Sequence, residues 1–355
     1  MEMSYTVHSS VTRQDRPHMK KRFTILIASL TLLLAAAWGY LFGYSDPPVD
    51  PAWELAPAET IPEGALTVRF AGTSTLLFDD GDTAFLFDGW FSRPGPLEVL
   101  LQKIAPDLDN IHWGLQRMQI DTLAAVIPLH SHYDHAMDTP AVAERTGATV
   151  YGSGATANIC RGWGLPEKRI ALLSDRAMFQ LGQFEITPIV STHFAYPDAR
   201  MRESLLENAD IPEPLIPPAS AFDYKLGKAY IFHVAHPQGS FLVVGSAGFV
   251  PGQLAGMDVD VLFLGTGGIG SQTADYREQF WAETAGQVRP ERVIPVHWDS
   301  LTGPLDGPLT GEVRIARLLA GSDEAALAFL RAKESANPDV EFATLPRFDP
   351  VVLFP

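Results

Sequence analysis

The longest apolar stretch of the chain lies near its start. From Phe23 to Tyr44 the sequence FTILIASLTLLLAAAWGYLFGY contains no charged residue. Its length matches the roughly 20 residues that a helix needs to cross the hydrocarbon core of a bilayer. Trp38 and Tyr44 stand at its far end, where aromatic side chains favour a membrane interface. The pattern predicts a transmembrane anchor over 23–44. A cleaved signal segment is the alternative, because residues 35–37 are small.

After this run the hydrophobic pattern changes. Residues 45–64 carry five prolines and no apolar periodicity, so we expect a linker there and a folded domain over 65–355. Short apolar or alternating runs predict β-strands at 66–71, 75–78, 83–88, 123–129, 149–151, 169–173, 178–181, 184–190, 229–233, 240–244, 259–264 and 292–296. Helical spacing predicts helices at 96–117, 140–146, 155–163, 274–287 and 322–335.

The order of these elements predicts an α/β fold. A β-rich stretch followed by βα units occurs twice, which is typical of two similar α/β halves packed sheet against sheet. The run 123–129 is continuously apolar, as in a strand buried on both faces, and it stops at His130. Residues 195–222 are rich in proline and charge and are expected to form a surface loop or lid.

Charge divides the chain into a basic start and an acidic body. The formal net charge is −16, yet residues 1–22 hold five basic and two acidic residues, which leaves 21 basic and 40 acidic residues and a charge of −19 for the rest. A body this acidic repels phosphate backbones, so no nucleic-acid partner is expected. The basic tail 1–22 predicts a cytoplasmic N-terminus and an extracytoplasmic domain, periplasmic in a bacterium, or a secreted one if the segment is cleaved.

The single cysteine limits the chemistry of any metal site. Cys160 alone excludes an internal disulfide framework and a thiolate-rich zinc site. It falls in a predicted helix, where we expect a small buried apolar side chain. A bound metal ion must therefore be held by histidines and carboxylates.

The segment LHSHYDHAMD supplies such residues. His130, His132, Asp134 and His135 follow directly after the buried strand 123–129. Three imidazoles and a carboxylate at this point are costly for a core and suited to a metal ion. His130 and His132 are two positions apart and can point the same way, while Asp134 and His135 can turn toward a neighbouring point.

Two further histidines occupy corresponding positions. His193 follows the apolar run 184–190, and His297 follows 292–296. Taken singly, each would more often be a structural histidine. Together with the cluster, they are expected to complete the walls of a metal centre.

The run from His130 to His135 resembles the HxHxDH signature of the metallo-β-lactamase superfamily, and the resemblance extends over roughly 65–355. It implies a four-layer αββα sandwich, in line with the two halves inferred above. It also implies two sets of metal ligands: His130, His132 and His193 for one ion, and Asp134, His135 and His297 for the second.

Within the superfamily, the sequence looks most similar to the branch of ascorbate-6-phosphate lactonases and N-acyl-phosphatidylethanolamine phospholipases D. The segments that carry this likeness are 70–74, 86–88 and 293–298. Asp88 is expected to support a ligand histidine. Thr73 departs from the pattern, because this branch often has a histidine at that position.

Ser246 is a second departure. The family bridges its two metal ions with an aspartate, and Ser246 stands at that position in Val244–Gly248. A neutral hydroxyl removes a negative charge that would offset the repulsion of two dications. The expected cofactor is therefore one or two zinc ions, with iron or manganese as alternatives.

These residues imply a membrane-anchored metal-dependent hydrolase. Zinc lowers the pKa of bound water to about 7, and Asp134 would orient or deprotonate that water for attack on an ester, lactone or phosphodiester. The expected partners are the membrane and a small-molecule or lipid-like substrate. His233 and His236 are interpreted as structural histidines, with proton donation to the leaving group as the alternative.

Two other functions stay open. Ser246 and the complete set of three histidines would also suit a mononuclear iron oxygenase or another redox protein of the same fold. A catalytically degenerate binding module at the membrane is the other alternative, although all six terminal ligands are retained.

Overall fold

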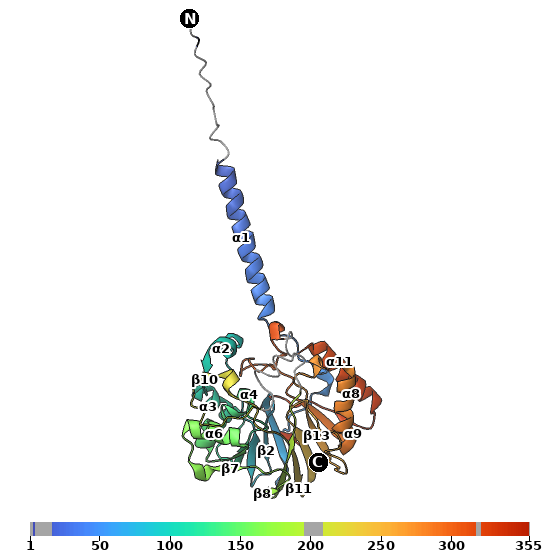
Figure 1. Cartoon of the computed structure of the whole chain (residues 1–355). Coiled ribbons are helices and arrows are strands. Elements are labelled where there is room, and N and C mark those ends of the chain that lie inside the picture. The colour runs from blue at the N-terminus through green and yellow to red at the C-terminus, as the bar shows by residue number, and fades with distance from the viewer. Residues whose placement is uncertain (1–2, 4–15, 195–208, 317–320, 355) are drawn as a thin grey trace. The chain divides into compact units, whose positions relative to one another are not determined.

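The computed structural model describes residues 3, 16–194, 209–316 and 321–354. The chain forms two compact units, Met1–Gly43 and Tyr44–Pro355. The first contains helix α1 (Arg16–Leu41), whose portion Lys21–Leu41 has a mean hydropathy of 1.9 and is long and apolar enough to cross a membrane (Figure 1). A signal sequence satisfies the same criteria. Most of the predicted basic tail lies outside the described residues.

The second unit is built on two seven-stranded sheets. The first has the order β16-β1-β2-β3-β5-β6-β7. Its strands are β16 (Val351–Val352), β1 (Thr67–Gly72), β2 (Thr75–Asp79), β3 (Ala84–Phe87), β5 (Ala125–Ile127), β6 (Thr149–Gly152) and β7 (Ile170–Leu172).

The second sheet has the order β15-β14-β13-β12-β11-β9-β8. Its strands are β15 (Glu341–Phe342), β14 (Arg292–Val296), β13 (Val261–Gly265), β12 (Gly239–Val244), β11 (Ala229–His236), β9 (Phe184–Ser191) and β8 (Phe179–Leu181). A small separate sheet pairs β4 (Lys103–Ile104) with β10 (Ala219–Ser220).

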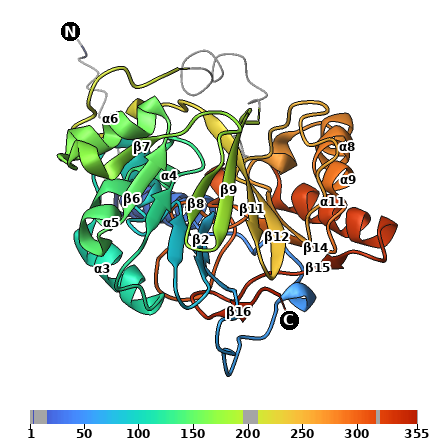
Figure 2. The ribbon, with the colours of Figure 1, turned by 90° about the horizontal axis from the view of Figure 1, so that it is seen from below.

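Helices cover the outer faces of both sheets. On the first sheet lie α3 (Leu108–Arg117), α5 (Thr139–Thr146) and α6 (Gly154–Trp163), and on the second α8 (Ala274–Glu283), α9 (Ala285–Val288) and α11 (Asp323–Ala336). Figure 2 shows the two groups on opposite sides of the paired sheets. The first half of the domain also contains two short helices, α2 (Pro96–Leu101) and α4 (Tyr133–Ala136). The predicted αββα layering is confirmed.

Aromatic side chains fill the space between the sheets. The Phe78 ring stacks on Phe241 of the facing sheet with centroids 4.2 Å apart, and Phe87 packs on Phe232 at 5.1 Å. All four side chains are fully buried. Rings of this size bury large apolar areas and prefer such offset or tilted contacts. The core therefore fixes the two sheets against each other, and with them the loops at the strand ends.

Strand direction places the important loops along common edges. β3 and β5 are parallel in the first sheet, so Asp88 and the segment from Leu129 emerge side by side. In the second sheet β12, β13 and β14 are parallel. β11 is antiparallel to both β12 and β9, so β9 runs in the same direction as β12. The residues that follow β9, β12 and β14 therefore leave from the same edge.

The segment predicted as a linker differs from expectation. Trp53 in this segment is buried, and its indole Nε1 donates to Glu334 at 2.8 Å. The amide of Leu55 donates to the carbonyl of Thr344. Prolines lack a backbone N–H donor, but they do not prevent an extended segment from packing on the domain. Burial of the Trp53 indole offsets the conformational entropy that is lost when the segment becomes ordered. This part of the segment is thus attached to the domain.

The predicted helical insertion 96–117 contains α2 and α3 but also strand β4, which its residue pattern did not indicate. Strand β4 pairs with β10, so that the end of the predicted 195–222 loop is ordered against the insertion. Residues 195–208 of that loop lie outside the described residues.

Candidate metal centre

One group of polar side chains forms a nearly equilateral triangle. The Nε2 atoms of His135 and His297 are 3.1 Å apart, and each lies 3.2 Å from Oδ2 of Asp134. The centre of such a triangle is about 1.8 Å from each corner, so the spacing of the three donor atoms would suit ligand bonds of ~2.0–2.2 Å to zinc. Asp134 and His135 come from α4, and His297 follows β14.

A second group lies beside the first. His130, His132 and His193 each offer a ring nitrogen within 4.8 Å of the others, and Nε2 of His130 is 2.9 Å from Nδ1 of His132. The rings of His130 and His135 have centroids 3.8 Å apart, which makes the two groups neighbours. All six ligand candidates named from the sequence are therefore brought together, in the same two sets of three.

Local structure orients these rings. His132 is the N-cap residue of α4, so the helix begins where the motif must turn from the first group to the second. The Nδ1 atom of His193 lies 3.0 Å from the carbonyl oxygen of Phe194, and the ring also offers a nitrogen to the first group. A second hydrogen bond of this kind commonly fixes the tautomer of a metal-binding histidine.

Asp88 orients His135. One of its oxygens, Oδ2, lies 2.8 Å from His135 Nδ1 and accepts from the Ser74 hydroxyl at 2.6 Å, while Oδ1 accepts from the Leu129 amide. All of Asp88 is buried. The structure thus brings Asp88 against a ligand candidate, as the sequence predicted, and adds Ser74, which the motifs did not single out.

Burial sets the charge of the first group. It lowers the pKa of His130 and His132 well below 6.5 and that of His193 to about 4, and neighbouring imidazoles add to this effect for all three. These rings are neutral at pH 7, as metal ligands must be.

The second group is electrostatically different. Burial opposes the charge of His135, but the carboxylates of Asp88 and Asp134 override it and raise its pKa to about 10. Burial also opposes ionisation of Asp134, yet His135 and His297 hold the pKa of that carboxyl well below its usual range. The carboxylates of Asp88 and Asp134 beside the His135 imidazole make a site that favours a cation. Binding of a metal ion by His135 would require the ring to release a proton.

The residues therefore fit a metal centre, by donor type and by spacing. His132 adds a further sign, because its buried Nε2 makes no hydrogen bond within the described structure while Nδ1 points into the first group. Neutral imidazoles together with one carboxylate suit zinc, iron or manganese.

Ser246 lies next to this centre and is hydrogen-bonded to the loop that carries His193. Its hydroxyl oxygen accepts from the Phe194 amide at 3.1 Å. The start of β11 lies on the side of the centre, because the Tyr230 amide donates to the carbonyl of Leu129. His236 is the last residue of this strand and therefore lies at the end away from the centre, where its Nε2 is 3.3 Å from Asp80 Oδ2. This position agrees with a structural role for His236.

A buried ion pair supports His297, and the sequence motifs gave no sign of it. His297 has a φ of +58° and its amide donates to the carbonyl of Thr73, whose own φ is +56°. The Thr73 amide donates to Asp299 Oδ1 at 2.5 Å, and Asp299 Oδ2 pairs with Arg93 at 3.1 Å. Gly72 is required here, because a Cβ would meet Arg93 at 2.5 Å and Asp299 at 2.6 Å.

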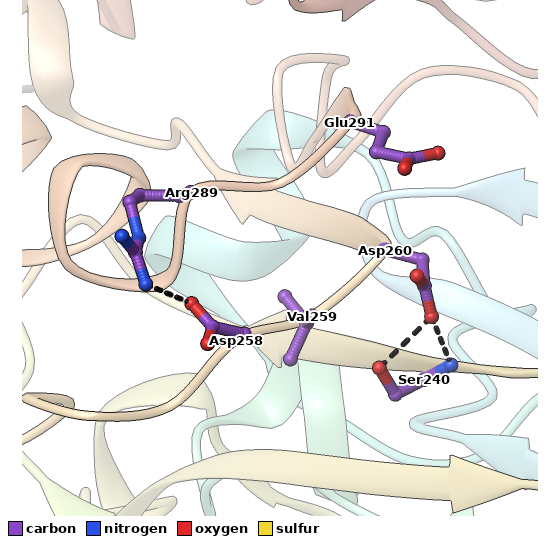
Figure 3. Close-up of a pocket in the computed structure, with 6 residues that line it drawn as sticks. All are labelled: Ser240, Asp258, Val259, Asp260, Arg289 and Glu291. Atoms are coloured by element: carbon purple, nitrogen blue, oxygen red, sulfur yellow. Dashed lines mark hydrogen bonds and ion pairs between the residues drawn. The ribbon is translucent and has the colours of Figure 1, made fainter.

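A surface hollow elsewhere does not belong to the centre. Ser240, Asp258, Val259, Asp260, Arg289 and Glu291 line it. Figure 3 shows two pairings among them, of Asp260 with Ser240 and of Arg289 with Asp258. The hollow lies at the amino ends of β12, β13 and β14, whereas His297 follows the carboxyl end of β14.

The titration of His193 predicts a pH dependence of stability. Its pKa is about 4 in the folded chain and 6.5 without burial, so between these values the unfolded chain binds more protons. Stability of the chelator-treated chain should therefore rise from pH 4 to about 6.5, by about 2 kcal/mol for a partly exposed ring. Thermal unfolding of His193→Gln should show a smaller rise, whereas His112→Gln, on α3 outside the centre, should match the wild type. Equal pH profiles for His193→Gln and the wild type would contradict this.

Comparison with known proteins agrees with the fold. The model of the beta-lactamase superfamily domain matches residues 83–298. No curated protein sequence matches significantly. Among solved structures, the diiron β-hydroxylase CmlA from Streptomyces venezuelae has 12% identity and a TM-score of 0.50, over 84% of this chain and 55% of CmlA. Igni18, a metallo hydrolase from Ignicoccus hospitalis, has 16% identity and a TM-score of 0.49, over 81% of this chain and 97% of Igni18. The metallo-beta-lactamase fold protein YhfI from Bacillus subtilis has 14% identity and a TM-score of 0.43, over 80% and 98%.

Fold and site together define a metallo-β-lactamase-type sandwich with clustered metal-ligand residues. Because the family model covers more than half of the chain, the chain belongs to the beta-lactamase superfamily. This superfamily includes metal-dependent hydrolases. The lactonase and phospholipase branch stays a prediction.

Proposed function

We propose that the chain is a membrane-anchored hydrolase that uses a metal-activated water to cleave an ester, a lactone or a phosphodiester. The observation that carries this proposal is the pair of adjacent three-residue groups at the strand ends. One group offers three neutral imidazoles, and the other combines two imidazoles with a carboxylate. Donor sets of this kind serve catalytic zinc and leave positions for water and substrate.

His130, His132 and His193 would hold one ion, and Asp134, His135 and His297 the other. A bound zinc ion supplies a water of lowered pKa and polarises the oxygen of the substrate that is attacked. The low pKa of Asp134 keeps it a carboxylate at neutral pH, so it can orient a water or accept its proton. Asp88 would accept from Nδ1 of His135 and so leave Nε2 for the ion once the ring has lost its second proton.

The anchor is the part of the proposal that concerns location. Lys21–Leu41 would span the bilayer, with the basic residues that precede it on the cytoplasmic side and the Tyr44–Pro355 unit outside the cytoplasm. A small-molecule or lipid-like ester or phosphodiester is the proposed substrate.

The test is a metal analysis of the full chain in detergent, purified without chelators, followed by a screen of ester, lactone and phosphodiester chromogenic substrates. We expect one or two zinc ions per chain, and hydrolysis that a chelator removes and added zinc restores. About two ions would mean that Ser246 does not prevent the second site from filling. A chain that neither retains metal nor binds added zinc would overturn the proposal.

An iron-dependent oxygenase of the same fold is the second candidate. Ser246 favours it, because the hydroxyl that replaces the bridging carboxylate is already engaged by the Phe194 amide. Iron in the purified chain, together with oxygen consumption and no hydrolysis, would select this candidate.

A further inference from the structure

Exposed apolar side chains of the domain gather in one region. Among the described residues of the Tyr44–Pro355 unit, eight large apolar side chains are exposed. Five of them belong to the insertion that contains α2, β4 and α3 or to the segment paired with it, namely Leu97, Leu100, Leu101, Leu108 and Ile216, with exposed fractions of 37, 48, 78, 59 and 71%. We call these five residues the insertion patch. Ile61, Leu172 and Met178 are scattered elsewhere.

Local structure brings the members of the patch together. Leu97 and Leu101 are one helical turn apart on α2, with Val99 of the same helix turned into the core. β4 pairs antiparallel with β10, with Ala219 opposite Ile104. The segment before Ala219, which contains Ile216, therefore runs beside the segment after Ile104, which contains Leu108. Figure 1 shows α2, β10 and α3 on the same side of the domain.

The chain that leads into the insertion contacts the same loop as Tyr44, the first residue of the domain unit. The Tyr44 hydroxyl donates to the carbonyl of Thr302 at 2.6 Å. The neighbouring carbonyl of Leu301 accepts from the indole of Trp90, six residues before the start of α2, at 2.9 Å. This loop follows His297, so Tyr44, the chain that leads into the insertion and the candidate metal centre are all attached to a few residues of one loop.

Chain length connects this loop to a bilayer. Only Phe42 and Gly43 stand between Leu41, the last residue of α1, and Tyr44. Three steps of extended chain span at most about 11 Å. If Lys21–Leu41 crosses a membrane, the chain itself keeps the Tyr44 edge of the domain near a membrane surface.

We propose that the insertion patch docks onto the bilayer that α1 anchors. Exposed leucines on a short helix gain free energy by entering the interfacial region, at roughly 25 cal/mol per Å² of apolar surface buried. The acidic body, with its charge of −19 outside residues 1–22, gives no attraction to anionic lipids, so the contact is apolar. The proposal goes beyond the proposed function and rests only on its membrane anchor.

The test places a bimane fluorophore at residue 101 through Leu101→Cys in the full chain, reconstituted into phosphatidylcholine vesicles. Leu101 is 78% exposed, so the substitution leaves the core intact. The native Cys160 is buried and its thiol pKa is raised to about 12, so it should not take up label. The matched control is Leu172→Cys, at an exposed leucine of β7 outside the patch.

We expect lipids brominated in the acyl chain to quench the probe at residue 101 several-fold more than the probe at 172, and acrylamide in water to do the reverse. The difference should persist in 0.5 M salt, because the contact is apolar. Equal quenching at both positions would overturn the proposal. So would a probe at 101 shielded from both quenchers, which would indicate that protein covers the patch. The measurement needs neither metal nor substrate, so its failure is separate from a failure of the proposed hydrolysis.

Discussion

Replacing His132 with alanine is expected to reduce hydrolysis by on the order of 10³-fold or more. Its Nδ1 lies 2.9 Å from Nε2 of His130, and loss of this ligand should empty the first group. A metal ion contributes several kcal/mol of charge stabilisation in the transition state, and each 1.36 kcal/mol is a factor of ten in rate. The measurement is kcat/KM of the full chain with a substrate found in the screen, together with metal content.

The fold should survive this change. His132 caps α4 through its backbone and makes no side-chain capping hydrogen bond, so alanine should leave the helix start in place. The matched control is His112→Ala on α3, a partly buried histidine paired with Arg145 and not with the centre, which should leave activity and metal content unchanged. If His132→Ala kept full hydrolytic activity, hydrolysis would not depend on an ion held by the first group, and this prediction would be wrong.

The candidate ligands could be found from the sequence because their signal is local. His130 to His135 lie in six consecutive positions after a strand whose continuous apolar run marks it as buried. His193 and His297 each follow a similar run, and parallel strand directions bring such ends to one edge. Asp88 also lies at the carboxyl end of a strand on this edge, since it follows β3, which is parallel to β5 and adjacent to it in the sheet.

Long-range pairs gave no such signal. The linker prediction from prolines missed the burial of Trp53, because its partner Glu334 is 281 positions away. The Arg93–Asp299 pair joins the segment just before α2 to the loop after β14. A lone Arg or Asp in a sequence is far more often a solvated surface residue than half of a buried pair, so composition and spacing cannot reveal it.

The Arg93–Asp299 pair is also where the second large effect is expected. Asp299→Ala should destabilise the full chain in detergent by about 3–5 kcal/mol, since it leaves Arg93 charged and buried without its partner. Arg93 is 7% and Asp299 2% exposed. Denaturant unfolding followed by tryptophan fluorescence measures this change. The matched control is Asp258→Ala, which breaks an exposed pair with Arg289 and should cost less than about 1 kcal/mol.

A double variant separates charge burial from the positioning of His297. Arg93→Met with Asp299→Leu removes both charges, and such replacements of a buried pair are often close to neutral for stability. It also removes the acceptor of the Thr73 amide, and the Thr73 carbonyl is what holds the His297 backbone at its positive φ. We therefore expect the double variant to fold but to bind zinc about 10–100-fold more weakly at the site that contains His297, the loss typical of removing a supporting contact. Wild-type zinc affinity in the double variant would show that the pair stabilises the fold without positioning the ligand.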